Sequence, residues 1–80
     1  MTSADFELLQ IRDTIFYRSP NYPRYTTNPN VRYKGVIVDA YGEFVKVRCL
    51  GQMRDVAFSK DWQGAEEFIS REDIIRVATP

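Results

Sequence analysis

The sequence predicts a single all-β domain, a small barrel of about five strands preceded by a short helix. Short runs of β-branched and aromatic residues recur along the chain, as in strands. Glycine, proline and asparagine separate these runs and favour turns. The 80 residues suffice for one domain. We therefore treat 1–80 as one unit, with an N-terminal extension at 1–12 and a long loop at 18–31.

The first elements are expected to be a short helix, one strand and the long loop. The helix begins near Ser3, whose hydroxyl is suited to cap its N-terminus. Residues 14–17 read Thr-Ile-Phe-Tyr and predict a strand. The prolines and asparagines of 18–31 remove backbone donors and favour turns. A loop of this length in a small domain is usually functional.

A hairpin is expected next. Its strands cover 32–40 and 43–50, and Gly42 in the turn between them can adopt positive φ. Apolar and charged residues alternate along the second strand, which is typical of a strand with one buried face. The side chains expected in the core are Val45, Val47 and Cys49, and those expected in water are Lys46 and Arg48.

The C-terminal third is expected to close the barrel. A turn at 50–52 leads to a strand at 53–59, and the segment 60–65 connects it to the last elements. Glycine within 50–52 favours that turn. The final elements are an apolar pair at 68–69, a short polar turn at 70–73 and an apolar strand at 74–77.

This ending resembles that of SH3-like small β-barrels. The residues that carry the resemblance are Phe68-Ile69-Ser70-Arg71-Glu72-Asp73-Ile74-Ile75-Arg76-Val77. The resemblance implies the barrel architecture and places the 18–31 loop beside a ligand groove. Peptide-binding SH3 domains carry Pro and Tyr in this turn, where this chain has Ser70 and Asp73. PxxP recognition is therefore not expected. The chain is also similar in size and strand order to the plasmid-borne type II dihydrofolate reductases, but it lacks their Val-Gln-Ile-Tyr signature.

Composition argues against catalysis. The chain has no histidine and one cysteine, so a Cys/His zinc site, a histidine base and an internal disulfide are all excluded. It has no glycine-rich phosphate loop. Carboxylates adjacent on a strand, as at 66–67, point to opposite faces and cannot share a proton. We therefore expect no enzyme activity, no metal site and no cofactor.

Targeting signals are not evident in the sequence. No apolar stretch approaches the roughly 20 residues of a membrane span. The first residues lack the cationic and apolar regions of a signal peptide. We expect a cytoplasmic protein without membrane contact.

A cluster of tyrosine and arginine in and beside the long loop is the leading candidate for a partner-binding site. Both residue types are enriched where binding energy concentrates. The competing interpretation assigns the tyrosines to the barrel core and to anchoring the loop. Trp62 is a further candidate, although a lone tryptophan also serves as a core plug. The candidate residues are Tyr17, Arg18, Tyr22, Arg24, Tyr25, Arg32, Tyr33 and Trp62.

These features predict a non-catalytic protein-binding module that acts as a small accessory subunit or inhibitor of a larger macromolecular complex. Adaptor, subunit and inhibitor are not separated by the sequence. The alternative is a nucleic-acid-binding small barrel, in which loop aromatics stack on bases and arginines contact phosphates.

The charge distribution bears on both interpretations. Net charge is zero. Charged residues within 14–38 are basic, whereas acids dominate 61–73. This polarity can orient a partner or pair across a homodimer, and its simplest role is to keep the surface solvated.

Overall fold

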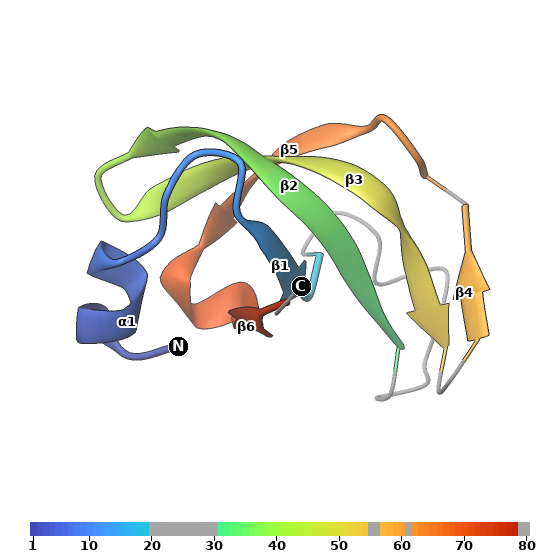
Figure 1. The fold of residues 1–80 in the computed structure, drawn as a ribbon, viewed down its shortest axis with the longest axis horizontal. Coiled ribbons are helices and arrows are strands. Elements are labelled where there is room, and N and C mark those ends of the chain that lie inside the picture. Colours follow the sequence, from blue (N-terminus) through green and yellow to red (C-terminus); the bar gives the residue numbers. More distant parts are fainter. Residues whose placement is uncertain (20–30, 55–56, 61, 79–80) are drawn as a thin grey trace.

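A computed structural model of the chain describes residues 1–19, 31–54, 57–60 and 62–78. These residues form an antiparallel sheet, one short α-helix and one turn of 3₁₀ helix (Figure 1). The predicted all-β class is confirmed, with six strands where about five were expected. The elements are α1 (Ser3–Glu7), β1 (Thr14–Tyr17), β2 (Val31–Tyr41), β3 (Phe44–Arg54), β4 (Ala57–Ser59), β5 (Glu66–Ser70), the 3₁₀ helix (Arg71–Asp73) and β6 (Ile74–Val77).

Helix α1 begins where the sequence predicted, but its cap lies one residue earlier. The hydroxyl of Thr2 accepts a hydrogen bond from the Asp5 amide at 3.2 Å, so Thr2 and not Ser3 is the N-cap. Phe6 and Leu9 pack against the core. The terminal amine of Met1 donates to the carbonyl oxygen of Ile74 at 3.3 Å, which ties the N-terminus to β6.

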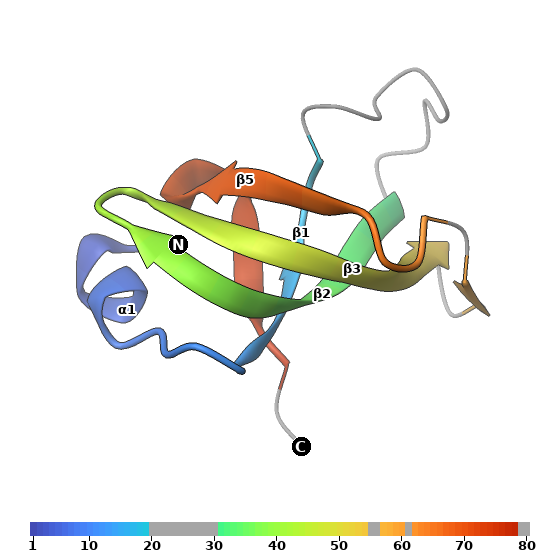
Figure 2. The ribbon, with the colours of Figure 1, turned by 90° about the horizontal axis from the view of Figure 1, so that it is seen from above.

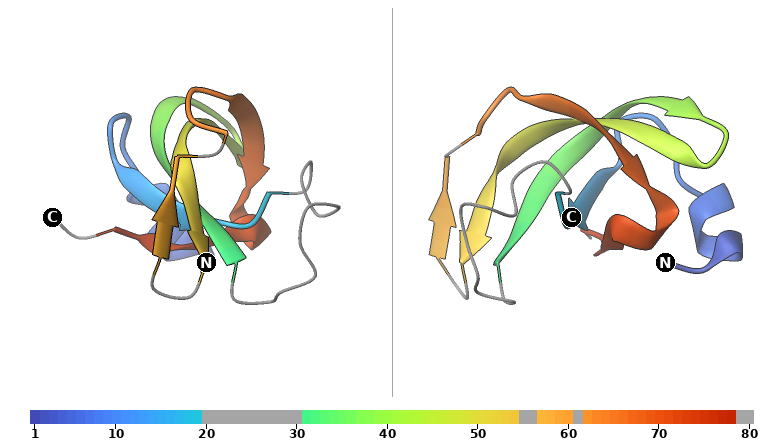
Figure 3. Two further views of the ribbon diagram at one scale, coloured as in Figure 1. Left: turned by 90° about the vertical axis from the view of Figure 1, so that its right-hand side faces the viewer. Right: turned by 180° about the vertical axis from the view of Figure 1, so that it is seen from behind.

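The strands form one strongly curved sheet in the order β4-β3-β2-β1-β6, and β5 pairs with β3. Figure 2 shows β2, β3 and β5 side by side, with β1 crossing beneath them. The two views of Figure 3 show how the long strands curve over the shorter ones. Among the described residues no ladder joins β5 to β6, so the sheet is not closed as a barrel would be.

The core fills the concave side of this sheet. Val45, Val47 and Cys49 of β3 are buried, which confirms the facing predicted from their alternation with charged residues. Each strand except β4 contributes buried side chains to the cluster. The remaining members are Ile15, Tyr17, Tyr33, Ile37, Ile69 and Ile74.

Gly35 marks the point where β2 bends. The pairing of β2 with β3 shifts register between Lys34 and Gly35. A Cβ at position 35 would overlap Val47 Cγ1 and would come within 2.9 Å of the Arg48 carbonyl oxygen and of Tyr17 Cε1. Only glycine allows the strands to approach this closely.

The turn predicted at 50–52 is wrong. These residues lie inside β3, where Gly51 pairs with Lys34 and Gln52 pairs with Tyr33. A Cβ on Gly51 would overlap the Ser59 carbonyl oxygen and the Phe58 ring. The glycine therefore permits close approach of β4 and does not form a turn.

The strand predicted at 53–59 is divided in two. Its first residues complete β3 and its last form β4, while 55–56 lie outside the described residues. Later elements follow the prediction, since β5 ends in a tight 3₁₀ turn that leads into β6.

Candidate functional site

The two strand tyrosines of the predicted cluster belong to the core. Tyr17 is fully buried and Tyr33 is almost so. Their ring centroids are 5.8 Å apart, and Gln52 Nε2 donates to the Tyr33 hydroxyl at 3.4 Å. Their side chains present almost no surface to a partner, which corrects their assignment to a binding site.

The other predicted residues are placed unequally. Tyr22, Arg24 and Tyr25 lie outside the described residues. Arg18 is exposed directly after β1, and its amide donates to the Asp73 carbonyl oxygen at 2.8 Å. Trp62 is half-buried in the turn before β5 and packs against the core, as its competing interpretation proposed.

Arg32 belongs to a group that we call the cationic surface: Phe16, Arg32, Lys34 and Arg76. Phe16 lies across the strands from Lys34 on β2 and from Arg76 on β6. The Arg76 guanidinium carbon lies 4.4 Å from the centroid of the Phe16 ring. The corresponding distances are 5.5 Å for Arg32 and 5.9 Å for Lys34 Nζ. All three cations are within cation–π range of one ring.

The two-residue period of β-strands creates this surface. Because Ile15 and Tyr17 enter the core, Phe16 between them faces outward. Arg32 and Lys34 alternate in the same way with buried Tyr33. Arg76 joins them through the pairing of β6 with β1. Phe16, Lys34 and Arg76 were not predicted as site residues. The alternation of buried and outward residues around Phe16 was a signal that could have identified Phe16.

The cations of the cationic surface form no ion pair among the residues that the structure describes. Phe16 is only 8 % exposed, so the cations cover the ring from water. The arrangement therefore presents positive charge outward from a rigid aromatic base.

Aromatic side chains gather on another part of the sheet, and we call Tyr41, Phe44 and Phe68 the aromatic surface. Their exposed fractions are 48 %, 48 % and 55 %. The Tyr41 and Phe68 rings meet edge to face with centroids 5.5 Å apart. Tyr41 and Phe44 face each other across the β2–β3 hairpin. Large exposed apolar patches are typical of interaction sites.

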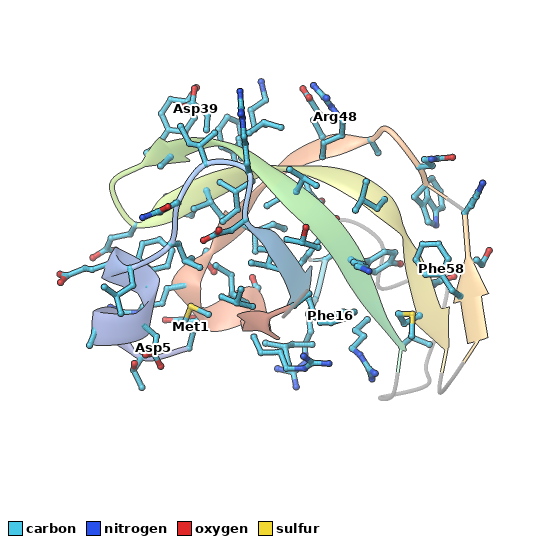
Figure 4. The ribbon with its side chains drawn as sticks, in the orientation of Figure 1. Met1, Asp5, Phe16, Asp39, Arg48 and Phe58 are labelled. Atoms are coloured by element: carbon cyan, nitrogen blue, oxygen red, sulfur yellow. The ribbon has the colours of Figure 1, made fainter. Side chains whose placement is uncertain are left out.

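Charged groups of both signs border the aromatic surface. The Tyr41 hydroxyl donates to Asp39 Oδ2 at 2.7 Å. This hydrogen bond is the largest cause of a lowered pKa for Asp39 and of a raised pKa for Tyr41. In Figure 4 the side chains of Asp39 and Arg48 extend from the side of the molecule opposite Phe16.

Glu66 forms ion pairs with the two cations nearest the aromatic surface. Its Oε2 accepts from Arg48, with Nη2 at 2.9 Å and Nε at 3.0 Å. Its Oε1 lies 3.6 Å from Lys46 Nζ. The hydrogen bond from Arg48 is the main reason that the pKa of Glu66 is lowered.

The acidic stretch does not assemble into a surface patch. Glu67 is buried and accepts a hydrogen bond from the Ser19 hydroxyl at 3.0 Å. Its neighbour Glu66 is exposed, as expected for adjacent residues of a strand. Asp73 accepts from the Ser70 hydroxyl at 3.1 Å within the closing turn. The expected basic stretch is described only at Arg18, Arg32 and Lys34, since Arg24 lies outside the described residues, as does Asp61 of the acidic stretch.

Catalytic groups are sparse in the described structure. Cys49 is buried, and desolvation raises the pKa of its thiol, which keeps it in the unreactive protonated form. The described residues hold no group of three or more Cys, Asp or Glu side chains that could bind a metal ion. In the same residues we find no helix with the length and apolar character needed to cross a membrane.

Comparisons of the chain with protein-family models, with curated proteins and with solved structures found no match. Functional inference therefore rests on the geometry of the two surfaces.

Proposed function

We propose that this chain is a non-catalytic protein-binding module, which acts as a small accessory subunit or inhibitor of a larger macromolecular complex. The observation that carries the proposal is the aromatic surface. Three aromatic side chains remain about half exposed on one face of a rigid hairpin and its neighbouring strand. Rings held in this way offer a large contact area at little entropic cost.

The surroundings of the aromatic surface support a protein partner. Asp39, Lys46, Arg48 and Glu66 place both signs of charge beside it. Protein interfaces commonly combine an apolar centre with a polar rim of this composition. A nucleic acid would meet as many carboxylates as cations here, so this rim offers its phosphates no net attraction.

The relation to SH3-like barrels is part of this proposal. It is supported by the order of strand, long segment, strand, hairpin, strand, two shorter strands, 3₁₀ turn and final strand. Members of such folds perform many functions, so the architecture alone assigns no partner. We also propose a cytoplasmic location, with which the free thiol of Cys49 is compatible.

Nucleic-acid binding is a second candidate, and the cationic surface is the observation in its favour. The chain as a whole carries no net charge, whereas phosphate-binding proteins usually have a basic excess. The only ring of this surface is covered by its own cations and is not open to a base. We therefore place the protein partner first.

Affinity capture from the source cell tests the proposal. We expect the tagged wild-type chain to capture a protein partner that nuclease treatment does not release. The double variant Phe44→Ala/Phe68→Ala should remain folded by circular dichroism and should lose most of that partner, because it removes two of the three exposed rings.

The matched control is Leu8→Ala/Ile11→Ala, which removes exposed apolar side chains from the N-terminal segment. It should capture the partner as the wild type does. Release of the partner by nuclease, or full capture by the Phe44→Ala/Phe68→Ala variant, would contradict the proposal.

A further inference from the structure

We propose that the cationic surface binds an extended, carboxylate-rich segment of a partner protein. The inference rests on the protein-binding function proposed above, and it names the chemistry of a second contact, separate from the aromatic surface.

The cations of the two surfaces differ in their ion pairs. On the outer face of β3, Lys46 and Arg48 share the carboxylate of Glu66. On the cationic surface, three cations lie around one ring. Asp5 and Asp13 line hollows beside Arg76 and Lys34, but no described acid forms an ion pair with any of the three cations. Like charges held together repel one another, and an anionic ligand removes that repulsion as it binds.

The cations of the cationic surface are preorganised for a ligand. Strand pairing fixes the backbone positions of Lys34 and Arg76 on either side of Phe16. Two steps between strands place these positions about 9–10 Å apart. An extended peptide presents same-face side chains about every 6.5–7 Å. Two or three carboxylates of such a segment can therefore reach the cations together, and arginine can hold a carboxylate with two hydrogen bonds.

A shallow hollow of about 400 Å³ lies beside Lys34. Leu50 and Val77 give it apolar walls, and Arg12 adds a further cation. Asp13 also lines it, with its Oδ2 held by a hydrogen bond from the Gln10 amide at 2.8 Å, so one carboxylate stands against the two cations Arg12 and Lys34. This hollow suits an aliphatic side chain of the same acidic segment.

A protein segment fits these features better than a nucleic acid does. A single strand of nucleic acid is usually held by stacking its bases on open aromatic faces. Here Phe16 is the surface's one ring, and Arg76 lies over it at 4.4 Å. The neutral chain also lacks the long-range field that gathers a polyanion.

Fluorescence anisotropy with three labelled probes tests the inference. The probes are a peptide of sequence Glu-Glu-Leu-Glu-Glu, its neutral counterpart Gln-Gln-Leu-Gln-Gln, and a single-stranded oligothymidylate. We expect the folded chain to bind the acidic peptide and neither of the others. Lys34→Gln/Arg76→Gln should weaken that binding about tenfold, because it removes two of the cations.

The matched control is Lys46→Gln/Arg48→Gln, which makes the same change of charge on the opposite face. It should leave peptide affinity within about twofold of wild type, since the altered cations lie far from the site. Amide chemical shifts in ¹⁵N spectra should move on β1, β2 and β6. Equal weakening by both variants would reduce the effect to net charge and would overturn the inference.

Two further outcomes would also overturn it. Tighter binding of the oligothymidylate through the same cations would assign the surface to nucleic acid, and absence of binding by every probe would leave no anion site. These results are distinct from failure of the proposed function, which is measured by protein capture through Phe44 and Phe68. Captured partner with no peptide binding would remove only this inference.

Discussion

The cationic surface and the aromatic surface use the same residue types in opposite ways. Beside the aromatic surface, Lys46 and Arg48 share the carboxylate of Glu66. Tyr41, Phe44 and Phe68 stay about half exposed. On the cationic surface the ring of Phe16 is buried under its neighbours and the charges stay open. One face thus offers apolar area and the other offers charge.

The difference arises from what lies across the strands. Glu66 of β5 pairs with Arg48 of β3, so an acid stands next to a cation. Phe16 of β1 pairs with Lys34 and Arg76, so an aromatic ring occupies the corresponding position. For Arg48, Lys34 and Arg76, the residue opposite on a neighbouring strand matches the partner of the cation. Lys46 lies opposite Phe68 and reaches Glu66 diagonally.

The largest expected effect is loss of both surfaces at once. Val47 of β3 is fully buried in the core. Val47→Asp places an unpaired carboxylate in the core, which costs several kcal/mol, against a total stability of about 4–12 kcal/mol for a domain of this length. We expect an unfolded chain by circular dichroism and no cooperative thermal transition.

Val77→Asp is the matched control for this substitution. Val77 is 36 % exposed near the end of β6, so the carboxylate reaches water and the fold should persist. A Val47→Asp chain that melts like the wild type would mean that the facing of β3 is reversed and that the comparison of its two sides is invalid.

A smaller effect sharpens the contrast in charge. Added salt screens the repulsion on the cationic surface and also weakens the attraction between Glu66 and its partners. Lys34→Gln/Arg76→Gln removes repulsion between cations, so added salt should stabilise this variant less than the wild type. Lys46→Gln/Arg48→Gln removes the ion pairs with Glu66, so added salt should destabilise this variant less than the wild type. Urea unfolding at low and high NaCl measures both. At low NaCl, we expect Lys34→Gln/Arg76→Gln to change the free energy of unfolding by about 0.5 kcal/mol or less. Salt responses that shift in the same direction in both variants would contradict the contrast.

The smallest effect concerns pH. The hydrogen bond from Arg48 lowers the pKa of Glu66 below its ordinary value of 4.5. A carboxyl with a lowered folded-state pKa stabilises the protein above the ordinary pKa, and this contribution disappears as pH falls through the lowered value. Glu66→Gln should therefore be less stable than wild type near pH 7, and the two melting temperatures should converge in acid. Parallel melting curves from pH 7 down to pH 3 would show that Glu66 contributes no such dependence.

Local pattern was enough to predict most elements of the fold. The strand at 14–17, the hairpin around Gly42 and the tight turn before β6 follow from propensity, turn residues and alternation. The turn predicted at 50–52 was wrong because glycine has two uses in β proteins. It can reverse the chain, or it can admit a neighbouring strand, as Gly51 admits β4. The strand that was not predicted is β5 (Glu66–Ser70), of which only the apolar pair at 68–69 was expected.

The candidate surfaces were much less accessible to sequence reasoning. Phe68 reaches Tyr41 only because β5 pairs with the start of β3, and Arg76 reaches Phe16 only because β6 pairs with β1. Neither pairing is a local property of the chain. Tyrosine content pointed to Tyr17 and Tyr33, but their place in the β1 and β2 alternation puts them in the core.

Strand β2 contributes to both surfaces, and this sets a geometric condition on any partner. Lys34 belongs to the cationic surface and Tyr41 to the aromatic surface, and the strand between them covers about 23 Å along its path at 3.3 Å per residue. A single partner that bound both would need about seven extended residues between its two contact points. Once one contact had formed, the other would be governed by effective concentration, so two weak contacts could give one durable complex.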